Sequence, residues 1–97
     1  MDDLKGKFVV VRGPPGVYAG VLEDVDDKRV IIKDCFCLWY SSGFASLNQL
    51  AMEGVKNVAE CKYSIEVPYM YLNDIFQILP CSDIARENLM SVKKWKL

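Results

Sequence analysis

Histidine is absent from the sequence, and with it the side chain that most often serves as a general base near neutral pH. Neither a Ser-His-Asp triad nor a Cys-His pair can therefore form within the chain. The carboxylates are scattered and show no spacing that pairs a general acid with a general base. We therefore expect a protein that is not an enzyme and that carries no cofactor.

A basic excess, a long apolar run and a signal sequence are also lacking. The chain has 12 Lys and Arg against 13 Asp and Glu, a net charge of -1, whereas proteins that bind duplex DNA through many phosphates are normally basic. No run of about 18 apolar residues is available to span a bilayer, and the opening MDDLKGK has no apolar signal region. We therefore expect no DNA partner, no membrane association and a cytoplasmic location.

A metal-binding arrangement of cysteines is missing as well, although the chain has four of them. Cys35 and Cys37 form a C-x-C pair in a predicted strand, where they would point to opposite faces. Cys61 and Cys81 stand alone, and zinc sites usually use pairs spaced C-x2-4-C. The sequence beside these thiols offers no sign of the cation that activates a cysteine nucleophile. We expect free thiols in a reducing compartment and no metal site.

Hydrophobic residues are plentiful, at 52% of the chain, which is enough for a core and argues against disorder. A length of 97 residues fits one domain, and no repeat, low-complexity segment or linker divides it. We therefore expect a single domain over residues 1–97.

Three segments rich in β-branched and aromatic residues predict hairpin-linked strands, at residues 8–11, 17–25 and 29–40. The first link, GPPG at 13–16, is a turn, since it lacks the Lys-Ser/Thr and the following helix of a phosphate-binding loop. Gly20 indicates a bulge or a close backbone approach in the second strand. Asp34 indicates a bend or bulge in the third.

The middle of the chain predicts a short helix over residues 47–52, whose Leu and Ala positions share one face. Ser46 is its predicted N-cap, and Gln49 lies where it would complete a capping box. Gly54 suits the C-terminal end of the helix. Residues 55–64 follow as a mixed connection.

The last third of the chain predicts two extended segments and a second helix. Pro68 places residues 65–71 at a sheet edge or in a loop, and residues 73–79 predict a strand. Ser82 caps a predicted helix over 83–90. Three apolar residues are expected to pack back on the sheet: Ile84, Leu89 and Val92. The order predicts an α+β fold, a small curled antiparallel β-sheet or open barrel with one short helix after the third strand and a C-terminal helix.

The stretch from Cys35 to Gly54 combines an aromatic strand end, a loop of Ser and Gly, and the start of a helix. Together these present flat aromatic faces, hydroxyls and backbone N–H groups. Such groups hold a small, planar, anionic ligand, so we place the binding site here. The candidate ligand contacts are Arg12, Tyr18, Trp39, Tyr40, Ser41, Ser42 and Ser46.

Each candidate also has a purely structural interpretation. Trp39 and Tyr40 can both be core aromatics, although strand alternation turns at most one of them to a given side. The serines can form turns and cap the helix. Arg12 can pair with a phosphate bidentately or simply end an exposed strand. Lys62 is a weaker candidate of the same kind, and the role of the basic tail KKWKL stays open.

Nearly the whole chain resembles a family of small phage and prophage proteins. The resemblance rests on VVVRGPPGVYAGVLEDVDDKRVIIKDCFCLWY, the Cys61-Lys62 pair, DIFQILPCSDIAREN and, most specifically, LWYxxGxASLxQLAxEGV at residues 38–55. Most members have an aromatic residue at the position of Ser41 and a small residue at that of Phe44. This chain departs at both positions, which leaves its ligand preference open.

Among phage proteins, the chain is similar to the anti-CBASS sponges, which sequester cyclic dinucleotide immune signals such as cyclic GMP-AMP without cleaving them. The resemblance implies an immune-evasion protein that forms a homo-oligomer, with a tetramer favoured, in the host cytoplasm during infection. Two-fold ligands are naturally held between symmetric protomers. The alternative is a small phage structural or protein-interaction module, which would present an aromatic surface without an anion-lined pocket.

Overall fold

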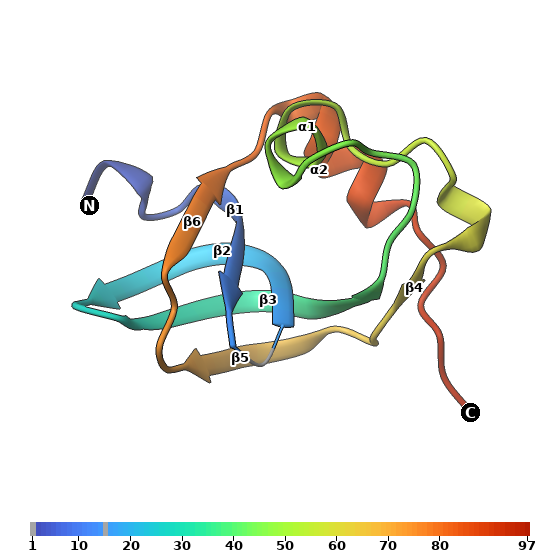
Figure 1. Ribbon diagram of the computed structural model, residues 1–97. Coiled ribbons are helices and arrows are strands. Elements are labelled where there is room, and N and C mark those ends of the chain that lie inside the picture. Colours follow the sequence, from blue (N-terminus) through green and yellow to red (C-terminus); the bar gives the residue numbers. More distant parts are fainter. Residues whose placement is uncertain (1, 15) are drawn as a thin grey trace.

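The computed structural model describes residues 2–14 and 16–97, without the side chain of Asp2. It confirms the predicted α+β class, with two helices packed on an open antiparallel sheet that does not close into a barrel (Figure 1). The strands of the described part are β1 (Phe8–Gly13), β2 (Gly16–Asp26), β3 (Arg29–Tyr40), β4 (Lys62–Tyr63), β5 (Val67–Leu72) and β6 (Gln77–Pro80). The helical segments are α1 (Leu47–Glu53), α2 (Asp83–Met90) and the 3-10 turns η1 (Asp2–Leu4) and η2 (Val58–Glu60).

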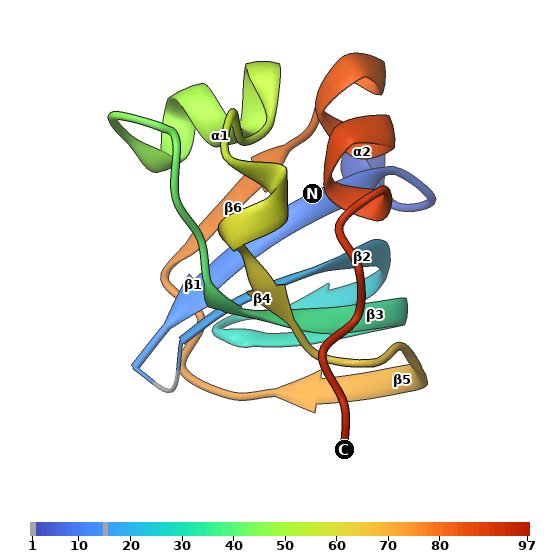
Figure 2. The ribbon, with the colours of Figure 1, turned by 90° about the vertical axis from the view of Figure 1, so that its right-hand side faces the viewer.

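The sheet has the order β4-β3-β2-β1-β6, and β5 also pairs with β3. β5 lies along residues 30–35 of β3 and β4 along residues 38–40, so the two follow each other on one edge of β3. The segment that contains Pro68 is therefore an edge strand, as predicted. Figure 2 shows α1 and α2 together above the sheet and β5 as its lowest strand.

A bulge between β2 and β3 curls the sheet, and it lies where the sequence predicted irregularity. Gly20 of β2 faces two residues of β3, Asp34 and Cys35, and Asp34 has a φ of 49°. A Cβ on Gly20 would lie 2.7 Å from the Cβ of Cys35 and 2.9 Å from the carbonyl oxygen of Lys33. Only glycine fits this approach, and the bulge adds twist to the pair of strands. The GPPG sequence lies between β1 and β2, and its Pro15 is outside the described residues.

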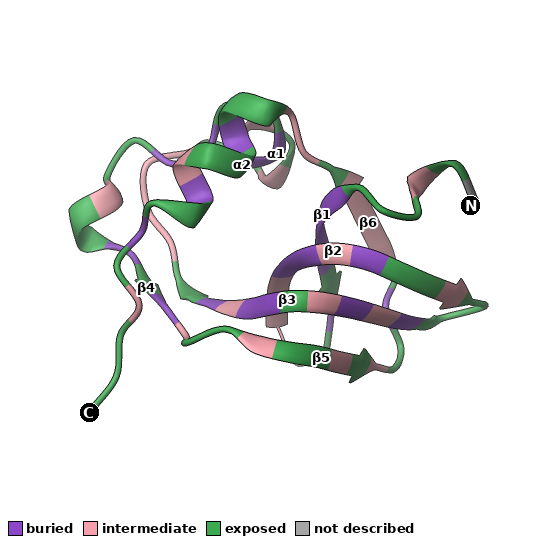
Figure 3. Ribbon diagram, turned by 180° about the vertical axis from the view of Figure 1, so that it is seen from behind, coloured by how far each residue is buried: buried purple, intermediate pink, exposed green. Residues whose placement is uncertain are grey.

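The sheet has an apolar cluster on each face. The first lies between the sheet and the helices and contains Phe8, Val10, Ala19, Phe36, Leu38, Leu50, Val55, Cys61, Tyr63, Leu89 and Val92. The second lies on the opposite face, where the sheet curls, and contains Val9, Val11, Leu22, Val30, Ile32, Cys35 and Ile75. Figure 3 shows buried residues along β1, β2 and β3, while the C-terminal segment is largely exposed.

Both helices begin at the predicted serine caps. The Ser46 hydroxyl accepts the N–H of Gln49 at 3.2 Å, and the Ser82 hydroxyl accepts the N–H of Ala85 at 3.0 Å. The capping box is displaced by one residue, because the Gln49 side-chain oxygen accepts the N–H of Ala45 at 2.6 Å. Gly54 closes α1 with a φ of 80°. Within the described residues, neither helix has the length and apolar character needed to cross a bilayer.

Three predictions for the C-terminal half are wrong in detail. Ile84 is 72% exposed, because Ala85 and Leu89 form the buried face of α2. The strand predicted over 73–79 pairs only from Gln77 to Pro80, since Ile75 instead enters the second apolar cluster. The connection over 55–64 contains β4, a two-residue strand that carries no periodic signal.

Asn88 of α2 fixes the chain just after α1, and its loss tests how the helices are joined. Its side-chain oxygen accepts the Val55 N–H at 2.8 Å, and its side-chain nitrogen donates to the Val55 carbonyl at 2.9 Å. We expect Asn88→Ala to lower the free energy of unfolding by about 1–3 kcal/mol, because both buried backbone groups lose their partner. Urea denaturation measures this. The control, Asn48→Ala on the exposed side of α1, should change it by less than about 0.5 kcal/mol, and equal losses would contradict the assignment.

Candidate ligand-binding site

The aromatic end of β3 lies on the surface. Trp39 is 62% exposed and Tyr40 is 53% exposed, although alternation along a regular strand would turn one of them inward. The reason is a register shift, because Leu38 pairs with Tyr63 and Tyr40 pairs with the adjacent Lys62. Trp39 is the extra residue, and the alternation restarts after it. The interpretation of both residues as core aromatics is therefore wrong.

The C-terminal segment brings a second indole to this place. The backbone N–H of Trp95 donates to the carbonyl of Tyr63 at 2.8 Å, and Lys94 forms a parallel bridge with Tyr63. Figure 2 shows the segment running beside β4. The ring centroids of Trp39 and Trp95 are 5.1 Å apart, with 26° between the planes. The sequence alone does not single out Trp95, whose only signal is an aromatic side chain within a basic tail.

Lys62 of β4 completes the site with a positive charge. Its Nζ lies 5.7 Å from the centroid of the Trp39 ring and 5.5 Å from that of Trp95. Attraction to the two π systems holds the ammonium group beside both indoles while it remains open to water. We call Trp39, Lys62 and Trp95 the indole–lysine cluster. The cluster joins three parts of the chain that are far apart in sequence: β3, β4 and the C-terminal segment. Lys62, which the sequence suggested only as a weaker phosphate-binding candidate, contacts both indoles.

Two open hollows adjoin the indole–lysine cluster. One, of about 320 Å³, is lined by Trp39, Tyr40 and Lys62. The other, of about 260 Å³, is lined by Cys37, Trp39, Lys62, Tyr63, Ser64 and Trp95. Aromatic surface with one cation at its edge can stack a flat ring and pair with a negative charge on that ring's substituent.

The three predicted serine contacts are engaged within the fold. The Ser41 hydroxyl donates to the buried Tyr63 hydroxyl at 2.8 Å, and the Ser42 hydroxyl accepts from the side-chain nitrogen of Asn57 at 3.0 Å. Ser46 caps α1. The hydroxyls therefore hold the loop against its neighbours, and none of the three residues lines the two hollows described above.

Arg12 and Tyr18 lie outside the indole–lysine cluster. The Arg12 guanidinium carbon is 5.1 Å from the centroid of the exposed Phe76 ring, and Arg12 is not among the residues that line the two hollows. Tyr18 is half-buried against the second apolar cluster, and burial, followed by the nearby Cys37, raises the pKa of its hydroxyl. Cys37, which pairs with Tyr18 across β2 and β3, lines the hollow of about 260 Å³, but Tyr18 itself lines neither hollow.

Cys35, Cys37 and Cys81 show no sign of activation. Burial raises the pKa of Cys35 to about 11 and that of Cys81 to about 12, and it also raises the pKa of Cys37. A nucleophilic cysteine needs the opposite shift. Within the described residues, no three Cys, Asp or Glu side chains come together in a way that could hold a metal ion.

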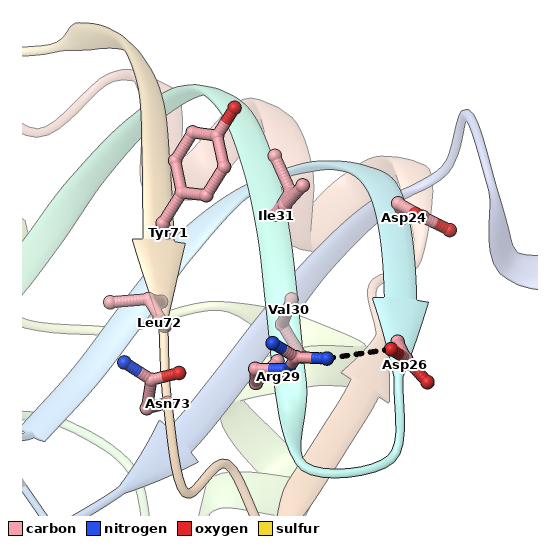
Figure 4. A pocket seen from close by; sticks show the side chains of 8 residues that line it. All are labelled: Asp24, Asp26, Arg29, Val30, Ile31, Tyr71, Leu72 and Asn73. Carbon is pink, nitrogen blue, oxygen red and sulfur yellow. Dashed lines mark hydrogen bonds and ion pairs between the residues drawn. The ribbon is translucent and has the colours of Figure 1, made fainter.

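A hollow of about 230 Å³ at the β2–β3 hairpin is a weaker candidate site (Figure 4). Its lining includes both acidic and basic groups, but they are already paired. Arg29 contacts Asp26 at 2.8 Å, and Asp24 contacts Lys5 at 3.2 Å. Little uncompensated charge is left there to select a ligand, whereas Lys62 forms no ion pair within the described residues.

Comparison with known proteins gives a family but no activity. The family described as "Domain of unknown function (DUF6948)" matches residues 6–89 of the chain. The same chain matches no curated protein. The indole–lysine cluster reaches beyond the matched range, because Trp95 lies in the C-terminal segment.

The stacked indoles are the only two tryptophans of the chain, so their optical signals report on this site alone. We expect an exciton couplet in the far-ultraviolet circular dichroism spectrum that either Trp39→Phe or Trp95→Phe removes. Tyr71→Phe changes an exposed aromatic residue on β5 and should leave the couplet intact. A spectrum that does not change on loss of Trp95 would show that the two rings are not stacked in solution.

The raised thiol pKa values predict slow chemistry at cysteine. At about pH 8, Cys35 and Cys81 should be almost entirely protonated in the folded protein, because thiolate forms only near their pKa values of about 11 and about 12. Iodoacetamide should label both residues much more slowly in the native protein than in urea, as read by mass spectrometry of peptides. Equally fast labelling of the native protein would contradict the burial described above.

Proposed function

We propose that this chain, which belongs to the DUF6948 family, is a binding protein that holds a flat, negatively charged ligand without converting it. The observation that carries the proposal is the indole–lysine cluster. The two tryptophans of the chain are half or more exposed, stacked at 5.1 Å, and share one lysine. Exposed stacked indoles cost hydrophobic free energy, and a ligand that covers them recovers it.

The chemistry of the indole–lysine cluster matches a nucleotide base with a phosphate. Stacking of a base on an aromatic side chain is worth about 1–3 kcal/mol, and it needs only a flat π surface. The Lys62 ammonium is a point charge that pairs with a phosphate oxygen from several directions. Protonated thiols and a sequence without histidine support binding without turnover.

Cyclic dinucleotides are the ligand class that we propose, following the resemblance to phage sponges. Such a ligand has two bases and two phosphates related by approximate two-fold symmetry. One cluster offers a single stacking site, whereas two copies related by a symmetry axis offer a pair. The proposal therefore includes a homo-oligomer, with a tetramer favoured, that sequesters the signal by mass action in the host cytoplasm.

A second candidate function is a small structural or protein-interaction module of a phage. The exposed side chains of Tyr69 and Tyr71, on the edge strand β5, favour it, at 56% and 77% exposure. An edge strand with aromatic side chains can pair with another chain. This function requires no nucleotide, so ligand titration separates the two.

Titration calorimetry with cyclic di-AMP, cyclic di-GMP, cyclic GMP-AMP and ATP tests the proposal. We expect at least one cyclic dinucleotide to bind, and Trp39→Ala to weaken that binding by about 1–3 kcal/mol because the stacking surface is lost. Tyr71→Ala removes an exposed aromatic residue of β5 and should bind as the wild type does. Mass spectrometry of the ligand after heat denaturation should recover it intact. No heat with any of these ligands, or equal effects of the two substitutions, would overturn the proposal.

A further inference from the structure

A third hollow, of about 620 Å³, lies between η2, β4 and the C-terminal segment. Four of its lining residues are lysines and one is a carboxylate. The full lining is Ala59, Glu60, Cys61, Lys62, Lys93, Lys94, Trp95 and Lys96. The whole chain has a net charge of -1, so this end collects a positive charge that the composition does not suggest. Within the described residues, none of the four lysines forms an ion pair with a carboxylate.

Lys94 differs from the other three lysines because its amine points into the protein. Its Nζ is buried, has no hydrogen-bond partner, and lies 3.3 Å from the centroid of the Phe36 ring. Burial lowers the pKa of this amine, and Glu66 opposes that shift. Lys94 therefore anchors the C-terminal segment to the first apolar cluster, whereas Lys62, Lys93 and Lys96 are exposed.

The lysine-lined hollow of about 620 Å³ and the hollow of about 260 Å³ beside the indoles share lining residues. Lys62 and Trp95 line both of them, so the two spaces meet at the indole–lysine cluster. A ligand that stacks on an indole there can extend its substituents toward Lys93 and Lys96. Unpaired ammonium groups around one hollow favour a compact group with several negative charges.

We infer that the hollow beside Lys93 and Lys96 is a phosphate subsite, and that the ligand is a small nucleotide whose base stacks on the indole–lysine cluster. This inference rests on the proposed function and assigns the ligand's phosphates to a place of their own. A small nucleotide fits better than a long polynucleotide. The lysines that line this hollow form one small cluster on a chain that is acidic overall, whereas a polynucleotide needs a basic track along many phosphates.

The test compares ligands that share one base and differ in phosphate: adenosine, AMP and cyclic di-AMP. Quenching of the two tryptophans reports binding of each. We expect the Lys93→Ala/Lys96→Ala double variant to weaken AMP and cyclic di-AMP by about tenfold or more and to leave adenosine unchanged. In the wild type, raising the salt from about 0.05 to about 0.3 M should weaken the phosphorylated ligands alone, since it shortens the Debye length.

Two control variants separate charge at this hollow from other effects. Lys7→Ala/Lys28→Ala removes the same charge from exposed positions that do not line the hollow, and it should bind all three ligands as the wild type does. Lys93→Arg/Lys96→Arg keeps the charge and should retain most of the affinity for AMP. Thermal unfolding followed by circular dichroism shows that each variant is folded.

The outcomes distinguish this inference from the proposed function. If Trp39→Ala abolishes binding while Lys93→Ala/Lys96→Ala binds AMP normally, the phosphate subsite is wrong and the proposed site stands. Equal weakening of adenosine and AMP, or tighter binding of a single-stranded oligonucleotide than of cyclic di-AMP, also overturns the inference. If none of these three ligands quenches the tryptophans, the phosphate subsite is overturned, whereas the cyclic dinucleotide proposal is overturned only if cyclic di-GMP and cyclic GMP-AMP also fail to bind.

Discussion

The hydrogen bond from the backbone N–H of Trp95 to the Tyr63 carbonyl, 2.8 Å long, is the contact on which the site depends. Tyr63 is fully buried and stacks on Phe36 with ring centroids 5.7 Å apart, so β4 is fixed to the first apolar cluster. That fixed strand presents Lys62 outward and accepts the C-terminal segment along its length. Without this docking, Trp39 would be a single exposed indole, with neither a second ring nor a lysine-lined hollow beside it.

The site combines rigid support with groups that are poorly satisfied by the protein itself. Trp39 is the bulged residue near the end of a long central strand. The residues around it are held by two hydrogen bonds: the Ser41 hydroxyl donates to the Tyr63 hydroxyl, and the Ser64 hydroxyl accepts the N–H of Cys37. The Lys94 amine is buried without a hydrogen-bond partner, which costs free energy that its contact with the Phe36 ring partly offsets. Proteins tolerate such costs most often where a ligand or partner is recognised.

The sequence was sufficient for features with a local cause. It predicted the three long strands, both serine caps and the Gly54 helix end, because each depends on residues a few positions apart. It also indicated the bulge, because Gly20 and Asp34 are residue types that suit irregular strand positions. It missed β4, which is two residues long, and the partnership of Trp39 with Trp95, which exists only after β4 and the C-terminal segment dock.

The loop serines illustrate the same limit. Their composition suits a ligand-binding loop, but their partners, Tyr63 and Asn57, lie well beyond α1 in the sequence. The most direct test of the indole–lysine cluster is a ¹H–¹⁵N NMR spectrum recorded while cyclic GMP-AMP is added. The two indole N–H signals and the amides of residues 62–64 and 93–97 should shift together. Shifts confined to the Arg12 turn or to the hollow at Asp26 and Arg29, or no shifts at all, would contradict the assignment of the site.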